Sequence, residues 1–292
     1  MENDKIFEIN TNRSWMYGGF ISTMKLQHNL SQKILFGNQS ISVNDGKRWY
    51  NFSIHNTALS DIIFSSLNDV CLDELGYLWI FTNKSCYRLK DHEIVDITST
   101  YPEFVGGDLF SLMSLPNGEV YVGIRNGLAK FNHSEGFTKI KGPISYTSYG
   151  TCKFGKDNKL TIFNGYRIGK IENDSVIYNK ENIIAESSID MSFDVSKDGI
   201  VWANLNEHLG KFENNKWEYF KLDSIHTGKV PFFVRIDSKD NLWFLSSSGV
   251  LAKWNQKDKP KFQYVTSTFD DLANIVGYEI DKFDNIWIAK AN

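Results

Sequence analysis

The stretch that decides the fold reads Ile236-Asp237-Ser238-Lys239-Asp240-Asn241-Leu242-Trp243-Phe244. Within it an apolar strand end is followed by a polar turn and then by an aromatic-centred strand. Asp and Asn tolerate the positive φ angles of tight turns, so the stretch predicts two antiparallel strands joined by a short turn. Related copies begin at residues 70, 115, 154, 195 and 280, and a degenerate copy covers residues 33–37.

The copies recur at an even spacing. Taking the aromatic position of each copy as an anchor, successive anchors lie 40 to 44 residues apart. The anchors are Leu35, Trp79, Tyr121, Thr161, Trp202, Trp243 and Trp287. The step from the last anchor through the C-terminus and round to the first is again 40 residues, as expected of a closed ring. Periods of about 40–50 residues are typical of β-propellers. We predict an all-β, seven-bladed β-propeller with four-stranded antiparallel blades.

The two ends of the chain complement each other. The C-terminal copy stops after its second strand, and residues 5–10 and 13–17 at the N-terminus have the pattern of third and fourth strands. We therefore expect strands from both termini to close the last blade, which removes exposed sheet edges. Residues 1–292 are then expected to form a single propeller domain.

Composition and charge exclude some classes of binding partner. The net charge is −3, which argues against phosphate-driven binding of nucleic acid, and no run approaches the ~20 apolar residues of a membrane span. Cys71, Cys86 and Cys152 are too far apart for a zinc site, so three buried thiols are expected. We predict a monomer in a reducing, cytoplasmic compartment, or in a periplasmic or extracellular one if a signal has been removed.

The repeat resembles the two-component regulator propeller repeat, best over residues 195–212 and 236–254. Streptogramin B lyases and NHL propellers have similar repeats, and residues 165–171 resemble the Ile-Gly-Arg-Ile element of the lyases. Such propellers serve bacterial sensor proteins, so the resemblance implies a module that binds a ligand or a protein. No His/Glu pair stands in a matching context, and no catalytic residue is carried over.

Candidate binding residues lie in two groups of connections that should share one face of the ring. These connections join the fourth strand of a blade to the first strand of the next, or the second strand to the third. Loops on a rigid scaffold commonly carry function, and aromatic and polar side chains suit a small polar ligand or a peptide. The candidates are Tyr101, Phe104, Arg125, Tyr146, Tyr149, His208, His226 and Phe269. Ordinary exposed loops would look the same in sequence.

A second group of candidates lies eight residues before each anchor, on the innermost strands. This level holds Gln27, Cys71, Met113, Lys153, Asp194, Arg235 and Glu279. The last four alternate in sign in neighbouring blades. We favour a chain of ion pairs that joins the blades, with contact to a polar ligand entering from the loop face as the alternative.

Three functions remain open. The first is a non-catalytic binding or sensor propeller that recognises a small polar ligand or a protein partner around the channel. The second is a lyase or hydrolase of the streptogramin-lyase type, and the third is an architectural subunit of a larger assembly. No cofactor or metal is expected, because the pairs Asp237/Asp240 and Asp281/Asp284 recur at turns whose N–H groups they would satisfy.

Overall fold

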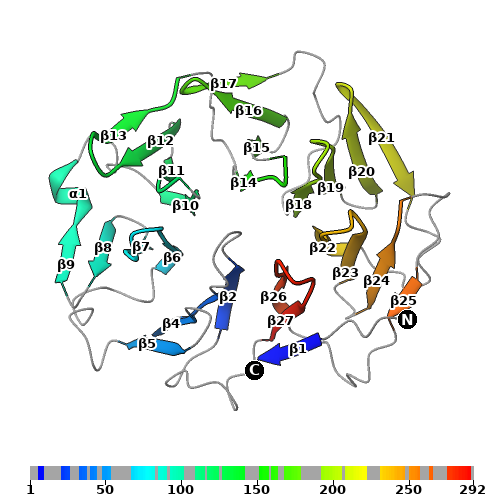
Figure 1. Ribbon diagram of the computed structural model, residues 1–292, viewed down its shortest axis with the longest axis horizontal. Helices are drawn as coiled ribbons and strands as arrows, with labels where there is room; N and C mark the ends of the chain where they lie inside the picture. Colours follow the sequence, from blue (N-terminus) through cyan, green and yellow to red (C-terminus); the bar gives the residue numbers. More distant parts are fainter. Residues whose placement is uncertain are drawn as a thin grey trace.

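The protein is a ring of β-sheets. A computed structural model describes residues 6–9, 21–26, 33–37, 40–44, 48–53, 67–82, 85–90, 93–101, 109–115, 117–124, 127–141, 151–157, 159–163, 168–178, 192–205, 208–221, 231–246, 250–256, 263–265 and 275–290. Within them six four-stranded sheets and one three-stranded sheet follow one another around a centre (Figure 1). This arrangement confirms the predicted all-β propeller.

Blades one to six are antiparallel meanders, with strands A to D running from the centre outward. Blade one is β2 (Ile21–Leu26), β3 (Lys33–Gly37), β4 (Ser40–Asn44) and β5 (Trp49–Ser53). Blade two is β6 (Leu67–Leu72), β7 (Leu78–Thr82), β8 (Cys86–Lys90) and β9 (Glu93–Asp96). Blade three is β10 (Leu109–Ser114), β11 (Val120–Ile124), β12 (Gly127–Asn132) and β13 (Gly136–Lys139).

The second half of the ring repeats the plan. Blade four is β14 (Thr151–Phe154), β15 (Leu160–Phe163), β16 (Ile168–Glu172) and β17 (Ser175–Tyr178). Blade five is β18 (Phe193–Val195), β19 (Val201–Leu205), β20 (His208–Glu213) and β21 (Lys216–Lys221). Blade six is β22 (Pro231–Ile236), β23 (Leu242–Ser246), β24 (Leu251–Trp254) and β25 (Gln263–Val265). A short helix, α1 (Ile97–Thr100), follows β9. No helix in the described ranges is long and apolar enough to cross a membrane.

Blade seven is closed by both ends of the chain, as expected, but with a different strand direction. It consists of β26 (Ile275–Ile280), β27 (Ile286–Lys290) and β1 (Ile6–Ile9). β1 runs parallel to β27, with Phe7 opposite Trp287. A third strand of a meander would run antiparallel, so β1 occupies the third position with the direction of a fourth strand. The fourth strand predicted at residues 13–17 lies outside the described residues.

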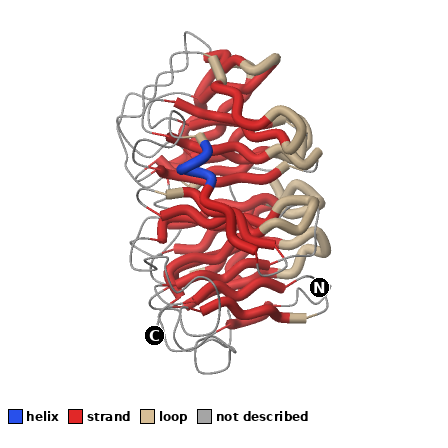
Figure 2. Tube along the Cα trace, turned by 90° about the vertical axis from the view of Figure 1, so that its left-hand side faces the viewer, coloured by secondary structure: helices blue, strands red, loops and turns tan. Residues whose placement is uncertain are grey.

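The described A–B turns gather on one face of the ring, which we call the turn face, and they lie among the tan loops on the right of Figure 2. In blade six, Asp240 adopts a positive φ of 60°, and the Asp237 carboxylate accepts hydrogen bonds from the backbone N–H groups of Lys239 and Asn241. The same carboxylate accepts the indole N–H of Trp243 at 2.9 Å. We call this pairing the Asp–Trp clasp. It recurs in blades two and seven as Asp73–Trp79 and Asp281–Trp287.

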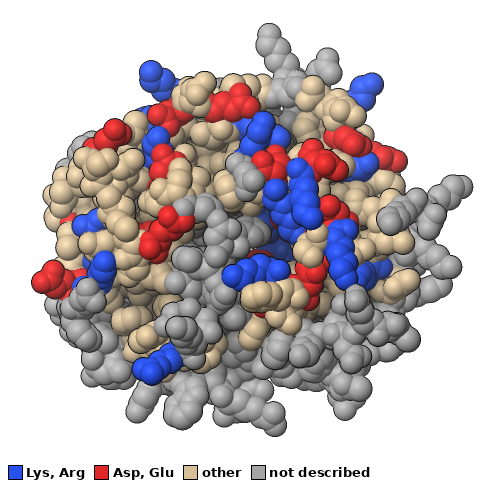
Figure 3. Space-filling view, viewed as in Figure 1, with Lys and Arg blue, Asp and Glu red and all other residues tan. Residues whose placement is uncertain are grey.

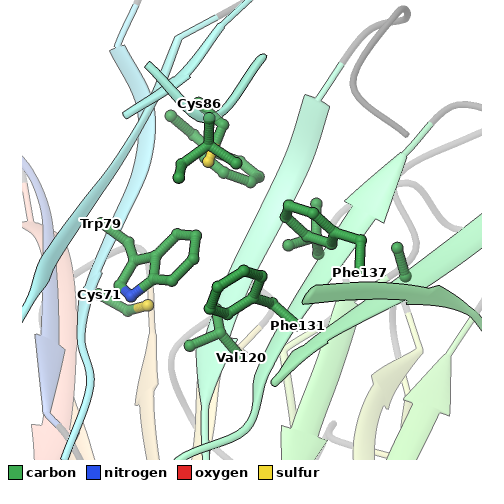
Figure 4. Packing of buried hydrophobic residues seen from close by; sticks show 10 residues of the cluster. Cys71, Trp79, Cys86, Val120, Phe131 and Phe137 are labelled. Carbon is green, nitrogen blue, oxygen red and sulfur yellow. The ribbon is translucent and has the colours of Figure 1, made fainter. Parts of the chain in front are cut away.

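The core lies between blades, because the anchors of blades one, two, three, five and six pack against the blade that follows. Trp79 of blade two is fully buried against Val120, Phe131 and Phe137 of blade three (Figure 4). The Trp79 and Phe131 rings meet edge to face at 4.9 Å. Cys71 and Cys86 lie in this cluster and form no disulfide, as predicted. Burial, followed by the nearby Cys71, raises the pKa of the Cys86 thiol well above its usual value. The side chain of Cys152 lies outside the described residues.

The strand register corrects the first repeat. In blades two to seven the anchor pairs with the residue eight positions earlier, as Trp243 does with Arg235. In blade one the corresponding pair is Ile34 and Lys25, not Leu35 and Gln27. Ile34 is fully buried against blade two, which is the position of an anchor. The prediction failed there because the A–B connection of blade one, residues 27–32, is one residue longer than the others.

Five of the seven inner strands also contain a register shift at one common position. One strand-A residue is skipped in the pairing of β2, β6, β10, β22 and β26. Each skipped residue stands three positions before the inner residue that pairs with the anchor. The skipped residues are Ser22, Asn68, Phe110, Phe232 and Val276. A bulge of this kind bends the strand and increases its twist.

Candidate functional site

Four charged side chains of the inner strands form what we call the charged arc: Lys153, Asp194, Arg235 and Glu279. Lys153 Nζ lies 3.3 Å from Asp194 Oδ1. The other Asp194 oxygen, Oδ2, accepts the backbone N–H of Ile236 in the next blade at 2.9 Å. Asp194 is 2% exposed, so these contacts satisfy a carboxylate removed from water.

Arg235 and Glu279 form the strongest link of the charged arc. Two parallel hydrogen bonds join them, from Arg235 Nε to Glu279 Oε2 at 2.7 Å and from Nη2 to Oε1 at 2.5 Å. Nη1 donates to the Ser192 hydroxyl and to the Val234 carbonyl, both at 2.8 Å. The guanidinium therefore binds the Glu279 carboxylate with two nitrogens, and its third nitrogen donates to blade five and to its own strand.

The electrostatics of this pair favour both charged forms. Burial alone would raise the pKa of Glu279, but the charges of Arg235 and Lys153 and the Arg235 hydrogen bonds outweigh it, so the pKa lies below its usual value. Burial would likewise lower the pKa of Arg235, yet the Glu279 charge raises it. The two charges are therefore mutually dependent, and neither is stable in this environment without the other.

The charged arc lies close to the turn face. Each member is the next-to-last residue of its inner strand before the A–B turn. At the turns themselves, the ammonium of Lys156 donates to the carbonyls of Ile236 and Asp237, two blades away, and that of Lys197 donates to the Ser238 carbonyl. Figure 3 looks onto this face and shows basic side chains gathered beside its centre. A ligand arriving from this face would reach the charged arc by a shorter path than one arriving from the loop face.

Two of the loop candidates are described, and both contact residues of outermost strands. The Tyr101 ring follows α1 and packs edge to face on Phe137 of the outer strand β13, at 5.2 Å. His208 starts β20 and contacts the Tyr219 ring of the outermost strand at 6.3 Å. The structure therefore gives these two residues packing contacts. The remaining candidates lie outside the described residues: Phe104, Arg125, Tyr146, Tyr149, His226 and Phe269.

The turn carboxylates have the structural role that the sequence predicted. Asp281 accepts hydrogen bonds from the backbone N–H groups of Phe283 and Asn285 and from the indole N–H of Trp287. Burial would raise the pKa of Asp281, but hydrogen bonds from Asn285 and Trp287 lower it below the usual value. Within the described ranges no group of His, Cys, Asp and Glu side chains is arranged to hold a metal ion.

Sequence reasoning missed two polar contributors. Ser192 joins Arg235 to blade five, and its position two residues before Asp194 on an alternating strand is the signal that could have identified it. His133 of blade three places Nε2 3.0 Å from an oxygen of the Asp73 carboxylate of blade two, which accepts its hydrogen bond. Nothing in the local sequence of His133 indicates that contact, since it joins residues 60 positions apart.

Comparison with known proteins identifies the fold. The chain matches no description of a protein family and no curated protein sequence. Among solved structures it is similar to virginiamycin B lyase from Staphylococcus aureus, with 15% identity, a TM-score of 0.67, and coverage of 93% of this chain and 92% of that one. It is also similar to the extracellular domain of a hybrid two-component system from B. thetaiotaomicron, with 15% identity and a TM-score of 0.66 over 98% of this chain and 38% of that one.

A third similar structure is YCF48 bound to D1 peptide, with 13% identity, a TM-score of 0.67 and coverage of 94% of this chain and 91% of that one. The lyase and the regulator domain are the two kinds of protein that the repeat resembled in sequence. Identities this low support a common architecture and carry no activity with them. The chain therefore has the β-propeller fold that the lyase and the two-component regulator domain share.

Proposed function

We propose that this protein is a non-catalytic binding propeller of the sensor type. It recognises a small polar ligand or a protein partner that enters the central channel from the loop face and reaches the charged arc near the turn-face end. The proposed contacts are Lys153, Asp194, Arg235 and Glu279 on the channel wall, with Phe104, Arg125, Tyr146, Tyr149, His226 and Phe269 at the loops.

The observation that carries the proposal is the state of Lys153. Its ammonium has three donor hydrogens and contacts Asp194 at 3.3 Å, while its side chain remains 16% exposed. Arg235, by contrast, is engaged on every nitrogen. Lys153 is thus the member of the charged arc with donors left to offer, and an anionic group such as a carboxylate is the natural acceptor.

The connections between blades support the proposed loop face. Strand A ends at the turn face in every blade, so in an antiparallel meander strand D ends, and the next strand A begins, on the opposite face. The connections on that face are long: residues 54–66, 140–150 and 179–192 are examples, whereas the A–B turn of blade six needs only 237–241. Long connections on a rigid scaffold are frequent carriers of binding specificity.

The test is a binding screen with a matched pair of lysine variants. Small carboxylates and capped acidic peptides are screened by thermal shift at low salt, and compounds that raise the melting temperature are titrated calorimetrically. We expect Lys153→Met to weaken binding by about tenfold or more, since a charge-assisted hydrogen bond is lost. Lys216→Met, an exposed lysine of blade five, serves as the control and should bind like the wild type.

Two outcomes would contradict the proposal. Equal affinity of Lys153→Met and wild type for every compound that binds would remove Lys153 from the site. Conversion of a bound compound to a product, followed by mass spectrometry, would show that the protein is a catalyst and would favour the lyase-type alternative.

A further inference from the structure

The repeats allow each blade interface to be compared with the others. At equivalent positions, an anchor on strand B of one blade faces a strand-C residue of the next. Between blades two and three, Trp79 meets Phe131 at 4.9 Å, and between blades five and six, Trp202 meets Trp254 at 5.4 Å. Two large aromatic side chains therefore fill the turn-face end of these interfaces.

The interface between blades three and four has smaller side chains at the same positions. The anchor is Tyr121 instead of Trp, and the strand-C residue is Ile171, which takes the place of Phe131. The residue of the Asp–Trp clasp is also replaced, because Leu115 stands where blades two, six and seven have Asp. A pocket of about 330 Å³ lies beside these smaller side chains, within the range of ~300–1,000 Å³ that is usual for ligand pockets.

The cavity has an apolar floor and a polar rim. The floor comprises Leu115, Tyr121, Phe154, Leu160 and Ile171, and the rim comprises Asn117, Lys159 and Glu172. Leu115, Tyr121 and Leu160 are each at most 8% exposed, so the floor belongs to the core that joins β11 to β15 and β16 (Figure 1). An aromatic ring would recover there the contacts that Trp and Phe provide at the other interfaces.

The rim has two exposed charges of opposite sign. Lys159 and Glu172 both line the cavity, and neither forms an ion pair with any described residue. Their neighbours are already engaged, since Lys130 holds both Glu119 and Asp174. An occupant with one positive and one negative group beside its ring would satisfy both rim charges at once.

We propose that this cavity is a binding site for a small aromatic zwitterion of the size of one aromatic amino acid. The ring enters between Tyr121 and Ile171, the carboxylate of the ligand meets Lys159, and its ammonium meets Glu172. The site lies on the turn face between blades three and four and is independent of Lys153 and the loop face.

The probe for the test is 5-fluoro-L-tryptophan, observed by fluorine NMR during titration with the intact protein. We expect saturable broadening and a shift of the fluorine signal. Matched probes that each lack one charge, 5-fluorotryptamine and 5-fluoroindole-3-propionate, should bind about tenfold more weakly, because each leaves one rim charge without its partner. Equal binding of all three probes, or no saturable binding of the amino acid, would overturn the proposal.

Variants separate the site from others on the ring. Ile171→Phe installs the residue that blade three has at this position, and should abolish binding while leaving the melting temperature equal or higher. Lys159→Met and Glu172→Gln change only exposed side chains and should each weaken binding about tenfold. Lys216→Met, which changes an exposed lysine of blade five, should bind the probe like the wild type. Retained binding in Ile171→Phe would place the probe elsewhere.

Discussion

The two halves of the ring carry different kinds of side chain at the inner-strand position that pairs with the anchor. In blades two and three this level holds Cys71 and Met113, which pack against apolar clusters. In blades four to seven it holds the charged arc. An apolar side chain can be replaced at a moderate cost, whereas a buried charge depends on its partner. The comparison teaches that single substitutions should lower the stability of the charged half more than that of the apolar half. Substituting both members of an ion pair should lower it less than substituting one.

The largest effect is expected from Arg235→Met. The change leaves Glu279 without its main cationic partner in a largely buried site, and should lower the free energy of unfolding by about 3–5 kcal/mol. Urea denaturation followed by tryptophan fluorescence measures it. The double variant Arg235→Met/Glu279→Met should recover most of the loss, because an apolar pair replaces the ion pair. A double variant less stable than the single one would refute the mutual dependence.

The second-largest effect is expected from acid, which should lower the free energy of unfolding through the carboxylates of the charged half. The folded-state pKa values of Glu279, Asp237 and Asp281 are lowered, so their stabilisation is complete above the unfolded values near 4 and is lost as the pH falls through the folded ones. We expect the free energy of unfolding to fall between about pH 5 and pH 2. Arg235→Met/Glu279→Met should lose less over this range, because it lacks one of the three carboxylates. Identical pH profiles would show that Glu279 contributes nothing.

A smaller effect is expected where the Asp–Trp clasp is broken. Asp237→Ala removes the acceptor of the Trp243 indole and of two backbone N–H groups, and should cost about 2 kcal/mol. Ser196→Ala is the matched control, since Ser196 holds the same position in blade five and, among the residues that the structure describes, accepts only the Ile200 N–H. Thermal denaturation of both variants should show the larger decrease for Asp237→Ala. Equal decreases would mean that the indole contact has no net value.

The smallest expected effect is a gain in stability. Trp202 of blade five is buried, and its indole N–H has no acceptor among the described residues, because Ser196 stands where three other blades have Asp. Ser196→Asp should complete a fourth Asp–Trp clasp and raise the free energy of unfolding by about 1 kcal/mol. A raised melting temperature would confirm it, and Ser196→Asn distinguishes the hydrogen bond from the added charge. A lowered melting temperature in both variants would contradict the comparison between blades.

The sequence was sufficient for the ring because the anchor period depends on local strand and turn preferences that every blade repeats. It was sufficient for the charged arc because alternation within a strand fixes which residues share a level. Blade one was misjudged because one extra residue in a connection shifts the register without changing the composition. The parallel direction of β1 could not be predicted either, since it depends on contacts between residues at opposite ends of the chain. Tyr101 was misplaced because a one-turn helix, α1, redirects the chain onto an outer strand.

The recurrent bulge in strand A changes which residues of an inner strand lie on the same side of the blade. In a pleated strand, odd and even positions face opposite neighbours, and an inserted residue exchanges the two parities. Between the bulge and the turn face, a residue an even number of positions from Arg235 or Glu279 lies on the same side of the blade as that residue. Beyond the bulge, toward the loop face, the residues on that side are an odd number of positions away. A count of alternate residues back from Arg235 or Glu279 therefore becomes wrong by one residue where the strand passes Phe232 or Val276.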